Sequence, residues 1–173
     1  MRQLVCKIIN MIILGVDPGT NRIGYGVLRL KDGNPVYLDC GCIELVSNKQ
    51  ENYSNLAELH GKISKLIKKW KVDIMSIEKL FFFKNAKTVM QVSEARGVIL
   101  LAAAQARVAI KEFTPLQAKQ AVSNDGRADK QAVQKMVRLV LGLDFDPKPD
   151  DAADALALAI CCANSSRITD LTV

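Results

Sequence analysis

The chain has 173 residues, which is enough for one ordinary domain with a hydrophobic core. Hydrophobic residues make up 49% of it and charged residues 24%, a composition that excludes a disordered or low-complexity chain. Lys and Arg number 24 against 18 Asp and Glu, so the formal net charge is +6. A polyanion is a fitting partner for such a chain, although charge alone assigns no function.

The sequence shows no pattern of a membrane span or of an export signal. Its longest uninterrupted apolar runs, residues 98–104 and 155–163, are far shorter than the roughly 20 residues that a spanning helix needs. Lys7 and Asn10 interrupt the apolar residues near the amino end, where a signal peptide would need a continuous core. The five cysteines are odd in number and match no zinc spacing, as expected of reduced thiols. We therefore expect a cytoplasmic protein.

Hydrophobic periodicity predicts the element order β-β-β-α-β-α-β-α-α-α, and with it an α/β fold in which helices pack on a sheet. Strands are expected over residues 11–16, 23–30 and 36–45, with a hairpin turn at 31–35, where Asp-Gly and Asn-Pro pairs occur. A helix over 54–70, a strand over 72–77, a helix from 85 to about 107 and a strand over 108–113 follow. Three more helices are expected from Thr114-Pro115, over 129–141, and from about 150 to 163.

Two of these helices carry further expectations. The lysines of the 54–70 helix lie mostly off its apolar stripe and are expected to face solvent, with contact to DNA as the alternative. The second half of the 85–107 helix is apolar nearly all round, which predicts burial on more than one side and would allow a subunit interface.

Four acidic residues occupy positions that a folded sheet can bring together. Asp17 and Glu78 each end an apolar strand, and Asp151 and Asp154 lie three residues apart in the first turns of the last helix. Taken singly, Asp17 suits a turn and Asp151 suits a helix start, so either could be purely structural. Gathered at one sheet edge, the four would repel one another and have raised pKa values unless a cation lay between them.

Carboxylate oxygens without a nearby His or Cys suit Mg²⁺ or Mn²⁺ better than zinc or copper. Two such ions about 4 Å apart could activate a water and stabilise the leaving oxygen of a phosphodiester. Other chemistries have weaker support: His60 is the single histidine and lies within a predicted helix, and the chain has no P-loop.

Four motifs in order resemble the RuvC family of bacterial Holliday junction resolvases. They are residues 12–26 (IILGVDPGTNRIGYG), 77–85 (IEKLFFFKN), 95–97 (ARG) and 151–156 (DAADAL), and the match runs from residue 11 to about 163. The resemblance implies an RNase H-like fold: a five-stranded mixed sheet flanked by helices. It also implies a homodimer that resolves four-way DNA junctions in homologous recombination and DNA repair, by paired nicks in strands of like polarity.

The resemblance assigns roles to particular residues. Asp17, Glu78, Asp151 and Asp154 would be catalytic and hold Mg²⁺, with Mn²⁺ as a substitute and two ions per site. Contacts to DNA would come from Phe81, Lys84, Lys119 and Lys130, with Phe81 stacking on an opened base. A partnership with the RuvA–RuvB branch-migration complex would follow.

The chain departs from the family pattern at two places. Phe82 and Phe83 leave open which ring stacks on DNA, and residues 1–10 precede the expected start of the family at Met11. We accordingly expect an amino-terminal extension of uncertain status over 1–10, one nuclease domain over 11–164 and a polar tail over 165–173.

Two alternatives to the resolvase are a related RNase H-like nuclease of the YqgF type, which acts on RNA, and a junction-binding protein without catalysis. The complete DAADAL ending and the segment from Phe81 to Asn85 favour the resolvase over the first, and the four intact acids count against the second. Sugar kinases and chaperone ATPases share the Asp17-x-Gly-Thr pattern but need two large lobes, for which this chain is too short.

Overall fold

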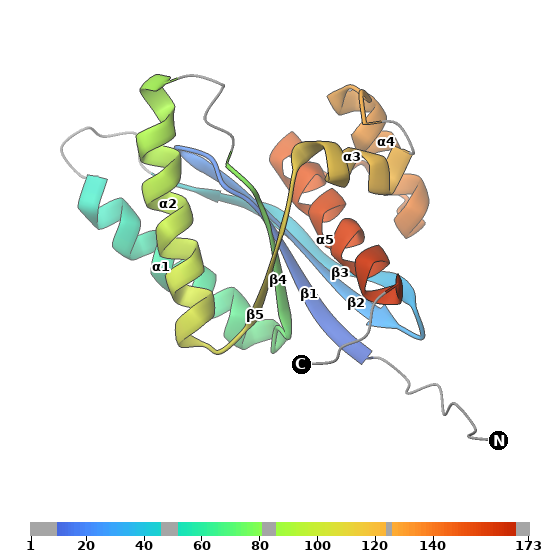
Figure 1. Ribbon diagram of the computed structural model, residues 1–173, viewed down its shortest axis with the longest axis horizontal. Coiled ribbons are helices and arrows are strands. Elements are labelled where there is room, and N and C mark those ends of the chain that lie inside the picture. The colour runs from blue at the N-terminus through green and yellow to red at the C-terminus, as the bar shows by residue number, and fades with distance from the viewer. Residues whose placement is uncertain (1–9, 46–51, 81–85, 124–125, 169–173) are drawn as a thin grey trace.

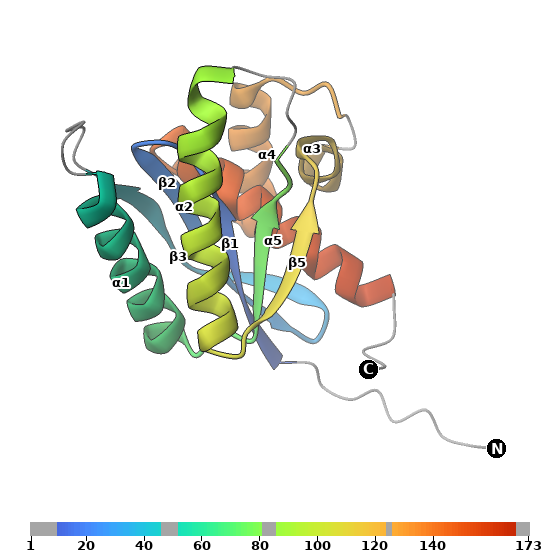
Figure 2. The same cartoon turned by 60° about the vertical axis from the view of Figure 1, so that its left-hand side comes forward.

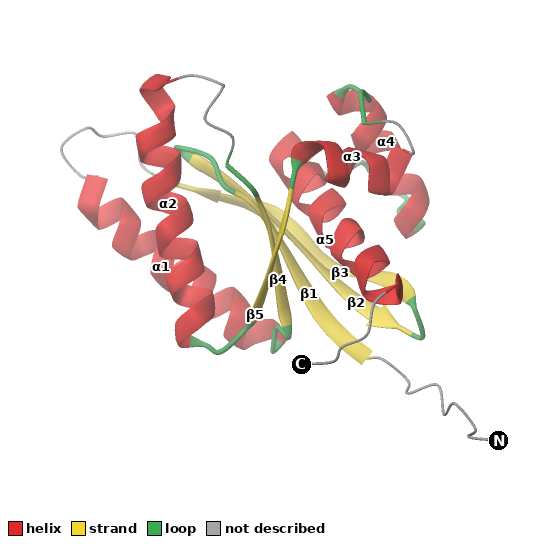
Figure 3. Cartoon of the chain, viewed as in Figure 1, coloured by secondary structure: helices red, strands yellow, loops and turns green. Residues whose placement is uncertain are grey.

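A computed structural model of the chain describes residues 10–45, 52–80, 86–123 and 126–168. The predicted element order is confirmed, as is the α/β class with a five-stranded mixed sheet (Figure 1; Figure 3). The strands are β1 (Asn10–Asp17), β2 (Arg22–Lys31), β3 (Asn34–Glu44), β4 (Ile74–Glu78) and β5 (Ala109–Phe113). The helices are α1 (Asn52–Trp70), α2 (Ala86–Gln105), α3 (Pro115–Ser123), α4 (Lys130–Leu141) and α5 (Asp150–Ile168).

The sheet has the strand order β3-β2-β1-β4-β5, with β1 at its centre. β1, β2 and β3 pair antiparallel, whereas β4 is parallel to both β1 and β5. Because the carboxyl ends of parallel strands meet at one sheet edge, this topology brings the ends of β1 and β4 together. Val16 is paired with Ile77, so Asp17 and Glu78 each follow one member of a paired position.

The β2–β3 hairpin is tighter than the sequence predicts. Lys31 pairs with Asn34, which leaves only Asp32 and Gly33 as the loop. Both have positive φ, 51° and 79°, as the two central residues of a type I′ turn require. The expected turn over 31–35 is therefore shortened by strand pairing on both sides.

Two helical layers enclose the sheet (Figure 2). α1 and α2 cover one face, and their core includes Leu59, Ile63 and Ile99 against Leu14 and Met75. α5 covers the other face, with α3 and α4 packed on its outer side. α5 is buried almost throughout from Ala152 to Ala163, which explains why its sequence is apolar all round.

α2 packs against both the sheet and α1, and part of its surface is exposed. Ala95, Ile99 and Ala102 are buried against the sheet, but Met90 and Leu101 are 70% and 51% exposed. Met90 and Leu101 are therefore uncovered within the described chain, and a subunit interface at this side of α2 stays a prediction.

The chain ends differ little from expectation where they are described. β1 begins at Asn10 and α5 continues to Ile168, beyond the expected domain end at 164. The expected extension lies almost entirely outside the described residues, as does the end of the tail.

Cys40, Cys42, Cys161 and Cys162 are free thiols. Among the helices described, none combines the length and the apolar character that crossing a membrane requires.

Candidate active site

Two of the four predicted acids are carried by strands. Asp17 ends β1 and Glu78 ends β4, and their carboxyl groups are hydrogen-bonded to each other. Burial, this hydrogen bond and the negative charges of Glu78 and Asp151 raise the pKa of Asp17 well above its usual value, although Lys130 lowers it. The pair thus holds more negative charge than its surroundings neutralise.

The other two acids are carried by the first turns of α5, and each contacts a basic side chain. Arg22 Nε lies 3.4 Å from Asp151 Oδ2, and Lys130 Nζ lies 3.8 Å from Asp154 Oδ2. Burial, followed by the charge of Asp17, raises the pKa of Asp154 to about 6, and Lys130 counters that rise. Lys130 is therefore the cation that acts on the strand-borne and the helix-borne acids together.

Glycines on the central strands allow α5 to approach the sheet closely enough to deliver its acids. A Cβ atom at Gly24 would lie 1.9 Å from the carbonyl oxygen of Asp151, and one at Gly15 would lie 2.0 Å from that of Ala155. Any larger residue would push the helix away from the strands. The buried Ser76 hydroxyl on β4 donates a hydrogen bond of 2.8 Å to the Leu158 carbonyl and ties the same helix to the next strand.

The backbone around Glu78 is held from α2. Arg96 Nε donates a 3.3 Å hydrogen bond to the Glu78 carbonyl, and its guanidinium forms an ion pair with Glu112 on the neighbouring strand β5. Arg96 therefore positions the end of β4 without contacting a reacting group. Arg96 belongs to the motif over 95–97, but the sequence does not show which groups its side chain contacts, so this role could not be deduced from it.

The donor chemistry of the four acids fits a divalent cation. Their oxygens are hard ligands, and burial together with neighbouring negative charge raises the pKa values of Asp17 and Asp154, a condition that an added cation would relieve. As the side chains stand, no three Asp, Glu, His or Cys groups in the described part of the chain converge closely enough to hold an ion. The acids are thus gathered at one edge, while Asp151 and Asp154 are engaged by Arg22 and Lys130.

A cleft of about 690 Å³ opens beside the acids, between the ends of β4 and β5 and helices α3 and α5. The charged residues that line it are two acids and two lysines, among mainly apolar side chains: Glu78, Asp154, Lys79 and Lys119. Lys119 Nζ also donates a 2.7 Å hydrogen bond to the Ala128 carbonyl, which fixes its position at the rim. The cleft therefore combines acids, cations and an apolar wall.

Comparison with known proteins identifies the family. The chain matches the family described as "Crossover junction endodeoxyribonuclease RuvC" over residues 13–162. It belongs to the RuvC family. A RuvC crossover junction endodeoxyribonuclease from Halothermothrix orenii is 49% identical over 158 residues, which cover 91% of this chain and 95% of that relative.

Solved RuvC structures have the same fold. The Thermus thermophilus RuvC structure superposes with a TM-score of 0.81 at 29% identity, over 91% of this chain and 96% of that one. A structure of the same protein in complex with Holliday junction substrate gives 0.80 at 29% identity and the same coverage. The predicted RNase H-like fold is thereby confirmed.

Membership of the RuvC family makes the chain a Holliday junction resolvase of the endodeoxyribonuclease class, as predicted. The matches do not favour the alternative of a YqgF-type nuclease. Nuclease activity in this family depends on a divalent metal ion.

The structure describes six of the eight site residues that the sequence singled out, and it adds two others. Asp17, Glu78, Asp151 and Asp154 lie at one sheet edge, with Lys119 and Lys130 beside them. Phe81 and Lys84 lie outside the described residues, so their roles stay predictions. Arg22 and Arg96 were missed, because their contacts with Asp151 and Glu78 join segments distant in sequence.

Proposed function

We propose that this resolvase hydrolyses the phosphodiester at a four-way junction with Asp17, Glu78, Asp151 and Asp154 as the ligands of two Mg²⁺ ions, which Mn²⁺ can replace. The observation that supports the proposal is the gathering of four acids from β1, β4 and α5 around too few cations. When bound, such ions supply an activated water and neutralise charge on the leaving oxygen.

The residues of the chain then have separate tasks. Asp17 and Glu78, fixed by the sheet register, provide the part of the site whose geometry changes least. Asp151 and Asp154 complete it when they exchange Arg22 and Lys130 for the metal, which leaves both cations available to DNA phosphates. Lys119, at the rim of the cleft, is suited to a further phosphate contact.

A homodimer fits this substrate, because two symmetric nicks in a junction of approximate twofold symmetry call for two sites related by a twofold axis. Two large apolar side chains exposed on α2, Met90 and Leu101, support a contact between two copies of the chain. A partnership with RuvA–RuvB and a place in the cytoplasm follow from the resemblance to the family and complete the proposal.

Recognition of the junction centre is assigned to the segment after Glu78. We propose that Phe81 stacks on an opened base and that Lys84 contacts a nearby phosphate. Glu78 immediately precedes this segment, so a base held there would lie next to the reacting phosphodiester. Phe81→Ala is expected to leave junctions bound but poorly cut, whereas unchanged cutting would transfer the stacking role to Phe82 or Phe83.

The decisive experiment compares a labelled four-way junction with a linear duplex of the same sequence, each with Mg²⁺ and with EDTA. We expect paired nicks only in the junction and only with Mg²⁺. Asp17→Asn serves as the matched inactive control, since it changes one ligand and keeps the shape of the side chain. Tight junction binding without nicks, or equal nicking of the duplex, would contradict the proposal.

A further inference from the structure

A second hollow, of about 660 Å³, lies on the α4 side of the acids, and its charged lining consists of three cations and two acids: Arg22, Lys130, Lys148, Asp150 and Asp151. We propose that this groove binds backbone phosphates of the cleaved DNA strand next to the phosphodiester that is cut, with Arg22 and Lys148 as contacts. The inference rests on the proposed nuclease function and extends it to a subsite for one strand.

The position of the groove relative to the acids supports this assignment. Asp151 lines the groove and Lys130, also in its wall, contacts Asp154, so the groove opens directly beside the proposed metal ligands. The cleft that contains Glu78 and Asp154 has mainly apolar walls, whereas the lining of the groove is mainly polar and charged. A DNA strand that crosses the acids therefore has more cations near its phosphates in the groove than in the cleft.

The cations of the groove are accessible to a ligand. The side chains of Arg22 and Lys130 are 49% and 64% exposed, and Lys148 is exposed as well. Because exposed ion pairs are weak, Arg22 can exchange Asp151 for a phosphate at little cost. Its planar guanidinium also allows two parallel hydrogen bonds to phosphate oxygens, which a lysine cannot form.

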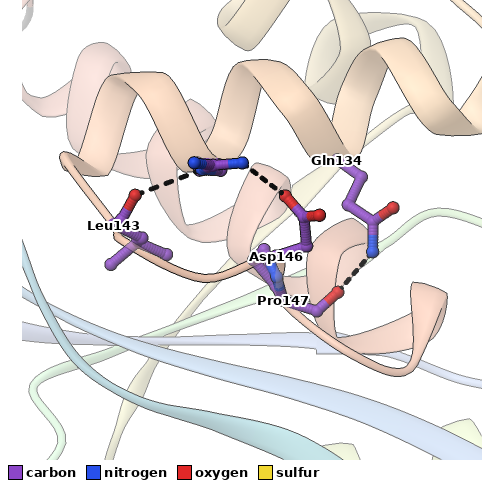
Figure 4. A network of polar contacts seen from close by, with 5 residues as sticks. Gln134, Leu143, Asp146 and Pro147 are labelled. Atoms are coloured by element: carbon purple, nitrogen blue, oxygen red, sulfur yellow. Dashed lines mark hydrogen bonds and ion pairs between the residues drawn. The ribbon is translucent and has the colours of Figure 1, made fainter.

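Hydrogen bonds to α4 hold the wall that carries Lys148 (Figure 4). Gln134 Nε2 donates a 2.6 Å hydrogen bond to the carbonyl of Pro147, the residue that precedes Lys148. Arg138 bonds the Leu143 carbonyl and Asp146, both at 3.3 Å, and so fixes the rest of the loop. The Asp129 carboxylate accepts a 2.7 Å hydrogen bond from the Ala132 amide and fixes the start of α4, next to Lys130. The groove is thus built before DNA binds, which lowers the entropic cost of binding.

The test compares R22Q/K148Q with K65Q/K68Q, a control that removes the same charge from exposed lysines of α1 on the opposite face of the sheet. Junction binding is measured in EDTA at several salt concentrations, and thermal unfolding checks that both variants fold. We expect affinity about tenfold weaker for R22Q/K148Q and a salt slope smaller by about 1.8, because each lost phosphate contact removes about 0.9. The control is expected to stay within about twofold of wild type, since its lysines lie far from the bound strand.

A modified substrate locates the contact. Neutral methylphosphonates at the phosphates next to the nick should weaken wild type and K65Q/K68Q, but should weaken R22Q/K148Q little further. The single variant K148Q keeps the Arg22–Asp151 pair. It should lower the salt slope by about 0.9, half of the decrease expected for the double variant. Equal affinities for the two double variants, or equal methylphosphonate effects in wild type and R22Q/K148Q, would overturn the groove assignment. If wild type itself makes no Mg²⁺-dependent nicks, the proposed function fails and the groove assignment with it.

Discussion

The strand-borne and helix-borne acids meet at one edge of the sheet under different constraints. Asp17 and Glu78 are placed by strand register and hydrogen-bonded to each other. Asp151 and Asp154 are placed by a helix, each beside a basic side chain. One half of the site is therefore fixed by the sheet, whereas the other depends on how α5 is seated and on which cation its acids contact.

The largest effect is expected when either half loses an acid. Asp17→Asn and Asp154→Asn should each reduce junction cleavage by orders of magnitude, because both halves are needed to hold the metal. Junction binding in EDTA should persist, since neither change removes a basic residue. Cleavage rates and gel-shift affinities measured side by side check this, and loss of binding together with cutting would contradict the assignment of Asp154.

Gly24→Ala tests whether the close packing of α5 on β2 is needed. The added Cβ would stand 1.9 Å from the Asp151 carbonyl oxygen, so the helix must move and stability should fall by about 3 kcal/mol. Cleavage should fall as well, because Asp151 moves with the helix. Gly61→Ala on α1 is the matched control: nothing lies within 4 Å of its Cβ, and it should stabilise the chain by about 0.5–1 kcal/mol. Urea unfolding measures both, and equal stabilities would show that α5 does not need Gly24.

Removing the charge of Asp154 should stabilise the chain in EDTA at neutral pH. The folded-state pKa of about 6 lies above the ordinary value of 3.8, so ionisation of Asp154 disfavours the folded state. This penalty is absent below pH 3.8, grows as pH rises and is complete above about pH 6. The advantage of Asp154→Asn over wild type should follow the same course and reach about 3 kcal/mol. Denaturant unfolding at a series of pH values checks it, and a difference independent of pH would contradict a penalty that arises from ionisation of Asp154.

The smallest effect is expected from Lys130→Gln. Its ion pair with Asp154 is 3.8 Å long and largely exposed on the lysine side, so stability should change by less than about 1 kcal/mol. Junction affinity should fall modestly and the salt slope should decrease by about 0.9 if Lys130 contacts one phosphate. A stability loss of several kcal/mol would instead mean that Lys130 is essential for the fold.

The sequence predicts the element order and both pairs of acids, because apolar strands ending in an acid and a helix opening on Asp151 and Asp154 are local patterns. It does not predict contacts between distant segments. Gly15 and Gly24 look like ordinary strand glycines until α5 is placed on them, and Arg22 and Arg96 gain their roles only through Asp151 and Glu78. An apolar sequence also does not say which sides of α2 are covered within one chain, where Met90 and Leu101 are exposed.

The most direct measurement is a calorimetric titration of Mn²⁺ into wild type, Asp17→Asn and Asp154→Asn. A single centre built from both halves predicts that each substitution weakens Mn²⁺ binding by more than about tenfold, because loss of an outer-shell partner alone costs about that much and a direct ligand contributes more. Wild-type affinity in either variant would show that the strand-borne and helix-borne acids do not share a metal, and would contradict the joint site.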